Sequence, residues 1–148
     1  MIRVQREDFD VGREIALLHE NNAAIGGICT FVGLVRDFAD GDTLAAMTLE
    51  HYPAMTEKAL GDIEAEALAR WPLDATVIIH RHGRLRAGDR IVLVGAASAH
   101  REAAFEACHF LIDWLKTKAP FWKLEEGARE RRWVAAKVED TAAAKKWE

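Results

Sequence analysis

The sequence predicts an α+β sandwich, in which helices pack on a mixed or antiparallel sheet. Short apolar runs alternate with stretches of helical periodicity in the order β, α, β, β, α, β, β, α. The longest helical stretch, residues 98–118, carries so much apolar surface that it is expected to be buried against a sheet. No internal repeat or linker divides the chain, which favours one domain over residues 1–148.

Composition excludes several classes of protein. The chain has 148 residues and a formal net charge of −4, which argues against general nucleic-acid binding but leaves room for a local cationic pocket. No apolar run is long enough to span a bilayer, and the first residues do not resemble a secretory signal. The two cysteines form no CxxC pair, which is typical of a reduced protein. We therefore expect a cytoplasmic location with no nucleic-acid or membrane partner.

Residues 1–52 are expected to form three strands and one helix. Asp10 can cap the helix, which ends near residue 20. Gly26-Gly27 opens the most apolar strand, and Arg36 follows that strand directly. The expected strands span residues 2–4, 28–35 and 44–52, with a loop at 38–43.

Residues 53–97 are expected to form a helix and two strands. The helix begins at Pro53 and ends near Trp71-Pro72, because proline is tolerated in a first turn and disfavours helix just before it. β-branched runs predict strands over 75–80 and 90–97, with turns between them. The expected buried stripe of the helix is Met55, Ala59, Ile63, Ala67 and Leu68.

The central helix is expected to start at a Ser98 cap and to end near Lys118, before Pro120. Its predicted buried stripe is Ala104, Cys108, Leu111 and Leu115, widened by Phe105 and Ile112 and flanked by Phe110 and Trp114. Beyond it, the sequence predicts a mobile charged loop over 124–132, an edge strand over 133–138 and a helix over 141–147 capped by Asp140.

Positively charged residues gather at the ends of these elements. Free N–H groups favour anions at a helix start, where His100 and Arg101 add donors. Lys116 lies in the last helical turn, and Lys123 follows the rigid apolar turn at Pro120. Taken alone, these cations could be solvated residues that offset the helix dipole. Together they predict an anion site with one or two reactive lysines.

Other chemistry has weak support. The sequence lacks GxGxxG and GxxxxGK[ST], so nucleotide-binding folds are disfavoured. His80 and His82 alternate on a predicted strand without a third ligand, which favours surface or packing roles over a metal site. Cys29 and Cys108 are expected to be buried and inert. No metal or cofactor is expected.

Several separated segments resemble the large, catalytic subunit of molybdopterin synthase. The segments occur in the family's order along nearly the whole chain, so the resemblance is more specific than any single motif above. They are FVGLVR (31–36), LEHYPAMTEKAL (49–60), SAHR (98–101), LKTKAPFWK (115–123) and RWV (132–134).

The resemblance implies an α/β hammerhead fold with an additional small antiparallel sheet. It implies a homodimer that forms a heterotetramer with a ubiquitin-like sulfur-carrier subunit, bound through that carrier's C-terminal Gly-Gly tail. The implied reaction transfers two sulfurs from the thiocarboxylated carrier to cyclic pyranopterin monophosphate, forming the dithiolene of molybdopterin in molybdenum cofactor biosynthesis.

The resemblance also assigns residues to the site. Lys116 and Lys123 are the implied catalytic residues. Lys137 stands where the family is expected to have an arginine that reaches the neighbouring subunit's pocket; lysine keeps the charge but loses the planar fork. The implied substrate-binding residues are Leu34, Val35, Arg36, His100, Arg101, Lys116, Lys123, Leu124 and Glu125.

Two other functions remain open at the level of sequence. A non-catalytic anion-binding or partner-docking protein could keep the fold and lose the chemistry, although intact Lys116 and Lys123 argue against that. An enzyme that forms a Schiff base through a lysine is the other alternative. The separate roles of the two lysines, the order of the two sulfur transfers and the identity of the carrier do not follow from the residues.

Overall fold

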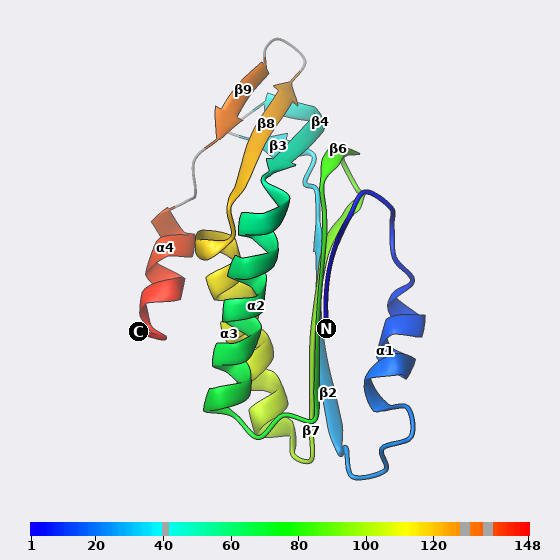
Figure 1. The fold of residues 1–148 in the computed structure, drawn as a ribbon. Coiled ribbons are helices and arrows are strands. Elements are labelled where there is room, and N and C mark those ends of the chain that lie inside the picture. Colours follow the sequence, from blue (N-terminus) through cyan, green and yellow to red (C-terminus); the bar gives the residue numbers. More distant parts are fainter. Residues whose placement is uncertain (40–41, 128–130, 135–137) are drawn as a thin grey trace.

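The computed structural model describes residues 1–39, 42–127, 131–134 and 138–148, and it confirms the predicted α+β class. Within these ranges the strands form two sheets, and helices pack around the first (Figure 1). The elements are β1 (Ile2–Gln5), α1 (Val11–His19), β2 (Gly27–Leu34), β3 (Phe38–Ala39), β4 (Asp42–His51), α2 (Pro53–Arg70), β5 (Ala75–Arg81), β6 (Gly83–Arg86), β7 (Arg90–Ser98), α3 (Arg101–Lys118), β8 (Phe121–Gly127), β9 (Arg131–Val134) and α4 (Val138–Lys145).

The first sheet has the strand order β1-β5-β7-β2 and is covered by helices on both faces. β1 is parallel to β5, and the other pairs are antiparallel. α2 and α3 lie on one face and α1 on the other (Figure 1). Strand residues alternate between the two faces. Accordingly Ile78 joins the cluster under α2 and α3, whereas Val77 and Ile79 join the smaller cluster under α1.

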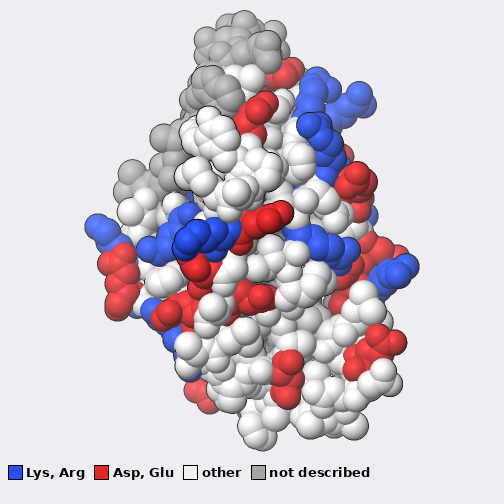
Figure 2. All heavy atoms as spheres, viewed as in Figure 1, with Lys and Arg blue, Asp and Glu red and all other residues white. Residues whose placement is uncertain are grey.

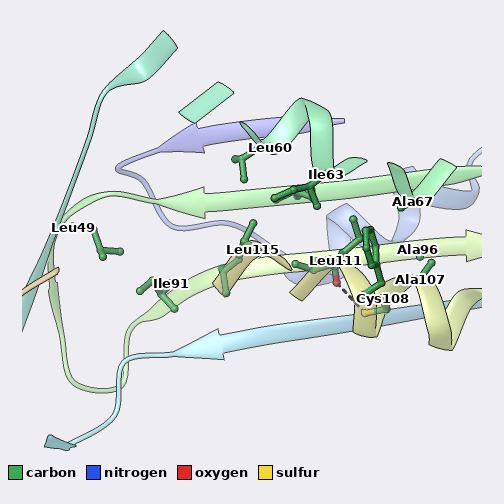
Figure 3. Packing of buried hydrophobic residues seen from close by; sticks show 14 of the residues in the cluster. Leu49, Leu60, Ile63, Ala67, Ile91, Ala96, Ala107, Cys108, Leu111 and Leu115 are labelled. Atoms are coloured by element: carbon green, nitrogen blue, oxygen red, sulfur yellow. Dashed lines mark hydrogen bonds between the residues drawn. The ribbon is translucent and has the colours of Figure 1, made fainter. Parts of the chain in front are cut away.

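The predicted stripe of α3 is confirmed for its four central residues, all buried. Figure 3 shows Cys108, Leu111 and Leu115 directed toward the strands of the first sheet. Phe105 does not widen this stripe and is 60 % exposed. A helix turns about 100° per residue, so Phe105 lies on a different side from Ala104. The sequence prediction was wrong there because any apolar neighbour of the stripe was counted as part of it.

The stripe predicted for α2 is also partly wrong. Met55 and Leu68 are exposed, whereas Ile63 and Ala67 are buried as expected. The buried face also contains Thr56 and Leu60. The correct face therefore includes a threonine, which a purely apolar pattern does not find.

The start of α3 differs from the prediction. The helix begins at Arg101, with His100 at the N-cap position and no side-chain capping hydrogen bond. Ser98 is instead the buried last residue of β7, and its hydroxyl donates to the Pro72 carbonyl oxygen at 2.7 Å. The Ser98 hydroxyl therefore bonds to a residue distant in the sequence, although the local sequence pattern predicts that it caps α3.

The second sheet corrects three predicted turns or loops and contains the expected additional antiparallel pairing. Its order is β3-β4-β8-β9. β6 pairs with the edge of β4 that lies opposite β8. The loop expected over 38–43 includes β3 and the start of β4, which pair with Phe38 opposite Thr43. The turn expected over residues 81–85 falls mostly in β6, and most of the loop expected over 124–132 lies in β8 and β9. β8 carries few β-branched residues, so pairing with β4 rather than local propensity makes it a strand.

The C-terminal elements are displaced from their predicted bounds. β9 covers residues 131–134 instead of 133–138, and α4 begins at Val138 instead of residue 141. Asp140 therefore lies in the first turn of α4 and not at its cap. An acidic residue in a first turn favours a helix through the dipole as well as through capping, so the sequence signal fits either position.

Phe110 offers a direct test of how the helices pack. Its ring is fully buried between Trp71, Trp114 and Trp147, with centroid distances of 5.3, 4.6 and 5.7 Å. We expect Phe110→Ala to lower the free energy of unfolding by about 3–5 kcal/mol, because it removes apolar contacts and leaves a cavity. Urea denaturation measures this change. Phe105→Ala on the exposed side of the same helix is the matched control, with an expected change within about 0.5 kcal/mol.

Candidate active site

Lys116 and Lys123 lie at the same end of the molecule. Lys116 is in the last turn of α3, and Lys123 is the third residue of β8, opposite Leu49 of β4. The Phe121 amide donates to the Ala119 carbonyl oxygen at 2.9 Å, which makes the turn between helix and strand tight. The positive charges of both lysines act on His80 of β5 and help to lower its pKa. The structure therefore places both ammonium groups within electrostatic range of one ring.

For His80, the sequence predicted only a surface or packing role. Its side chain is 8 % exposed, and its ring stacks on Phe121 with a centroid distance of 3.9 Å and an interplanar angle of 16°. Nδ1 donates to the Arg81 carbonyl oxygen at 2.8 Å. The pKa of His80 is lowered to about 3. Burial is the largest cause, the hydrogen bond to Arg81 opposes it, and the positive charges of Lys116, Lys123 and His51 contribute to the lowering. His80 is neutral near pH 7.

This lowered pKa predicts a pH dependence of stability. The unfolded chain can protonate His80 below its ordinary pKa of 6.5, whereas the folded chain resists protonation until about pH 3. The unfolded state then binds more protons, so the free energy of unfolding falls as the pH falls between these values, by at most about 1.4 kcal/mol per pH unit from this group. Urea denaturation at several pH values should show a shallower decline in His80→Phe than in the wild type. An unchanged slope would argue against a buried neutral His80.

Further rings surround His80 and Phe121. His51 of β4 lies 4.4 Å from the His82 ring and 5.7 Å from the Phe121 ring, and its Nδ1 is 3.1 Å from the Thr56 hydroxyl. Beside them is a cavity of about 330 Å³, lined by Glu50, His51, Tyr52 and Trp122. Trp122 and Tyr52 make an edge-to-face contact at 5.0 Å and are both exposed. An aromatic-walled cavity therefore opens at the start of β8, next to the lysine-bearing strand.

Arg36 lies at the lysine end of the molecule. β2 is antiparallel to β7, with Leu34 opposite Arg90, and α3 returns across the same sheet after β7. The last turn of α3 therefore lies over the end of β2. Val35 is buried, and its backbone exchanges hydrogen bonds with Gly88 and Asp89, whereas Leu34 is 55 % exposed. Arg36 is exposed just beyond this anchored residue.

His100 and Arg101 lie at the opposite end of α3. A Cβ placed on Gly27, the first residue of β2, would lie 3.6 Å from the Arg101 Cα, so the helix start lies against the start of β2. Residues 101 and 116 are separated by about 22 Å along a helix that rises 1.5 Å per residue. Within one chain, Lys116, Lys123 and Arg36 therefore lie at one end of the molecule. His100 and Arg101 lie at the other end.

The remaining predicted site residues are distributed as follows. Leu124 follows Lys123 in β8, paired with Thr48 of β4 and Trp133 of β9. Glu125 is in the same strand, opposite Met47. Lys137 lies outside the described residues.

The described residues contain no group of three or more His, Cys, Asp or Glu side chains arranged to hold a metal ion. Cys108 is buried as expected, and burial, followed by the neighbouring Cys29, raises the pKa of its thiol. Cys29 itself is only partly buried, so the expectation of full burial was wrong for it. Over the part of the chain that the structure describes, none of the helices is both long and apolar enough to cross a membrane.

On the face shown in Figure 2, Lys and Arg side chains are interspersed with Asp and Glu side chains. A mixed surface of this kind produces no extended positive field. On that face the cations are not organised as a broad polyanion-binding surface, in agreement with the acidic composition.

Comparison with known proteins identifies the family. The family model described as MoaE protein matches residues 4–118. The chain belongs to the MoaE family. It is 58 % identical over 147 residues to a molybdopterin synthase catalytic subunit from Pseudomonas aeruginosa, covering 99 % of this chain and 98 % of that one.

Solved MoaE structures agree with the observed fold. The molybdopterin biosynthesis MoaE protein from Burkholderia ambifaria is 49 % identical, with a TM-score of 0.85 over 99 % of this chain and 97 % of that chain. A more distant neighbour, from a complex of subunits 1 and 2 of the molybdopterin-converting factor of Helicobacter pylori, is 21 % identical, with a TM-score of 0.73 over 90 % and 89 % of the two chains. At that identity the likeness concerns the fold alone.

Proposed function

We propose that this MoaE chain is the catalytic subunit of a molybdopterin synthase. In this role it transfers two sulfurs from a thiocarboxylated carrier protein to cyclic pyranopterin monophosphate, and the product is the dithiolene of molybdopterin. The observation that carries the proposal is the convergence of Lys116 and Lys123 beside a buried, neutral histidine. The name of the Pseudomonas relative, identical at 58 % of aligned positions, supports the same activity.

The lysines suit the chemistry of sulfur transfer. Attack by a thiocarboxylate sulfur on the pterin side chain needs proton transfer and stabilisation of developing negative charge. A lysine ammonium supplies both, since it carries protons that it can donate and a positive charge. Lys123 is only partly exposed, so part of the surrounding water is excluded and its charge acts more strongly than in bulk water.

A homodimer would complete the pocket. In the described residues, β2 pairs on one side only, with β7, and it exposes Phe31 and Leu34 by 40 % and 55 %. An apolar strand edge of this kind is a ready pairing surface. If two copies pair antiparallel through β2, the start of one strand meets the end of the other. Arg101 of one protomer then approaches Arg36 and Lys116 of its partner.

This arrangement assigns roles to the separated cations. His100 and Arg101 of one protomer, with Arg36 of the other, bind the substrate phosphate, because helix starts and guanidinium groups favour anions. The pterin then lies against the lysine pair, with Leu34, Val35, Leu124 and Glu125 as further lining residues. Lys137 is proposed to contribute charge across the dimer.

The second partner is a ubiquitin-like sulfur carrier, one at each end of the dimer in a heterotetramer. The Pseudomonas relative is named a catalytic subunit, and a subunit belongs to a complex with at least one further chain. A Gly-Gly tail is thin because glycine lacks a Cβ, so it can enter between side chains. The cavity lined by Glu50, His51, Tyr52 and Trp122 opens beside β8 and could admit such a tail. The cytoplasmic location stays a prediction.

Reconstitution tests this function. The chain is mixed with thiocarboxylated carrier and the pyranopterin, and the product is analysed by mass spectrometry. We expect a product with two added sulfurs, and none with a carrier that lacks its two terminal glycines. Absence of sulfur transfer with the intact carrier would overturn the proposal. Trapping of a carbonyl substrate by borohydride would instead favour the Schiff-base alternative.

A further inference from the structure

The ring pair of His80 and Phe121 joins β5 to the start of β8. Phe121 and Lys123 are two residues apart in β8, so their side chains leave the strand on the same face. His80 stacks on Phe121 at 3.9 Å and therefore lies on the face from which Lys123 projects. Lys116, from the last turn of α3, acts on the same ring. Three elements meet at this histidine.

The hydrogen bond of His80 determines its tautomer. A carbonyl oxygen only accepts, so Nδ1 must carry the proton that it donates to Arg81. In a neutral imidazole the other nitrogen, Nε2, then has a free lone pair. Lysine ammonium groups are donors only. An acceptor nitrogen on this largely buried ring therefore lies within electrostatic range of two lysines that can only donate.

We propose that His80 is a positioning residue for sulfur transfer, and that its Nε2 accepts a hydrogen bond from a lysine of the Lys116–Lys123 pair and holds that ammonium group toward the substrate. The stack on Phe121 fixes the ring, and the bond to Arg81 fixes the tautomer. This inference rests on the proposed catalytic role of the two lysines.

A purely structural role makes a different prediction, and two substitutions separate the roles. His80→Phe keeps an aromatic ring for the stack on Phe121 but removes both nitrogens. His80→Gln loses the stack but can place an amide oxygen, an acceptor, near the position of Nε2. If His80 only packs, His80→Phe retains more activity than His80→Gln. If Nε2 positions a lysine, the order is reversed.

His82 provides the matched control. It is a neighbouring histidine in the same ring cluster, and its ring lies 4.4 Å from His51. Burial lowers its pKa, and the charges that act on it are those of His51, Arg6, Glu7 and Glu50, not those of the two lysines. His82→Phe and His82→Gln therefore make the same chemical changes without touching the lysine pair.

The main measurement is the rate of sulfur transfer under saturating and limiting substrate, alongside thermal unfolding. We expect His80→Phe to lower kcat roughly tenfold to a hundredfold with KM nearly unchanged, because the reacting groups are misplaced while the substrate still binds. His80→Gln should retain a higher kcat than His80→Phe despite a lower melting temperature. Both His82 variants should stay within about twofold of the wild type. A kcat that follows the melting temperature across the His80 variants would overturn the proposal.

A second measurement needs only folded wild type and lysine variants. The ¹⁵N chemical shifts of the His80 ring should show the Nδ1–H tautomer, and removal of the partner lysine by Lys116→Ala or Lys123→Ala should shift the Nε2 signal. An Nε2–H tautomer, or an Nε2 signal that neither variant moves, would overturn the proposal. If the lysine variants keep normal rates of sulfur transfer, the proposed function fails instead.

Discussion

Replacing Lys116 or Lys123 with alanine is expected to lower the single-turnover rate of sulfur transfer by about a hundredfold or more, the range of a lost general acid. Both side chains lie at the junction of α3 and β8, and neither is buried in the core. Their removal should therefore change the melting temperature by only a few degrees.

Lys118→Ala is the matched control for this experiment. Lys118 is two residues from Lys116 on the same helix, but its ammonium group lies 4.4 Å from the centre of the Trp114 ring. It should keep a near-normal rate. Near-normal rates in both Lys116→Ala and Lys123→Ala would show that the catalytic assignment is wrong, whereas a loss in all three variants would indicate a nonspecific effect of positive charge.

Mixing two inactive variants is expected to restore activity. If each pocket takes Arg101 from one protomer and Lys116 from the other, a heterodimer of Arg101→Ala and Lys116→Ala chains contains one intact pocket and one doubly defective pocket. Random exchange of protomers makes about half of the dimers mixed, so recovery should approach about a quarter of the wild-type activity. The reason is geometric, because these two residues are about 22 Å apart within one chain.

Native mass spectrometry of differently tagged chains measures the exchange, and the sulfur-transfer assay measures the recovery. The control pair is Lys116→Ala with Lys123→Ala, both assigned to the same pocket, in which each mixed dimer still has one defect per pocket. That pair should stay inactive. Complete exchange without recovery in the first pair would contradict the composite pocket, and sedimentation that shows only monomer would contradict the dimer.

Several elements could be predicted from the sequence because their signals are local. The buried stripe of α3 follows from helical periodicity, and its end follows from Pro120, which disfavours helix in the residue before it. The Asp10 cap was also predicted, and its carboxylate accepts from the Arg13 amide at 3.1 Å. In each case a residue acts on partners within a few positions.

The missed features depend on distant partners. β8 is a strand because β4 offers it an edge, although the composition of residues 121–127 is not typical of a strand. Ser98 does not cap α3, because the Pro72 carbonyl oxygen takes its hydroxyl. His80 could not be distinguished from an ordinary packing histidine, since Phe121 and the two lysines reach it from other elements.

The sequence by itself determined the α+β class, the family and the residue types of the candidate site, since these are carried by periodicity and by motifs that can be read along the chain. Only the tertiary structure decided which cations lie together. Arg36 and Lys116 are far apart in sequence but share one end of the sheet, whereas Arg101 and Lys116 occupy opposite ends of one helix. The physical reason is that a rigid helix fixes the separation of its own residues, while strand pairing brings distant segments into contact.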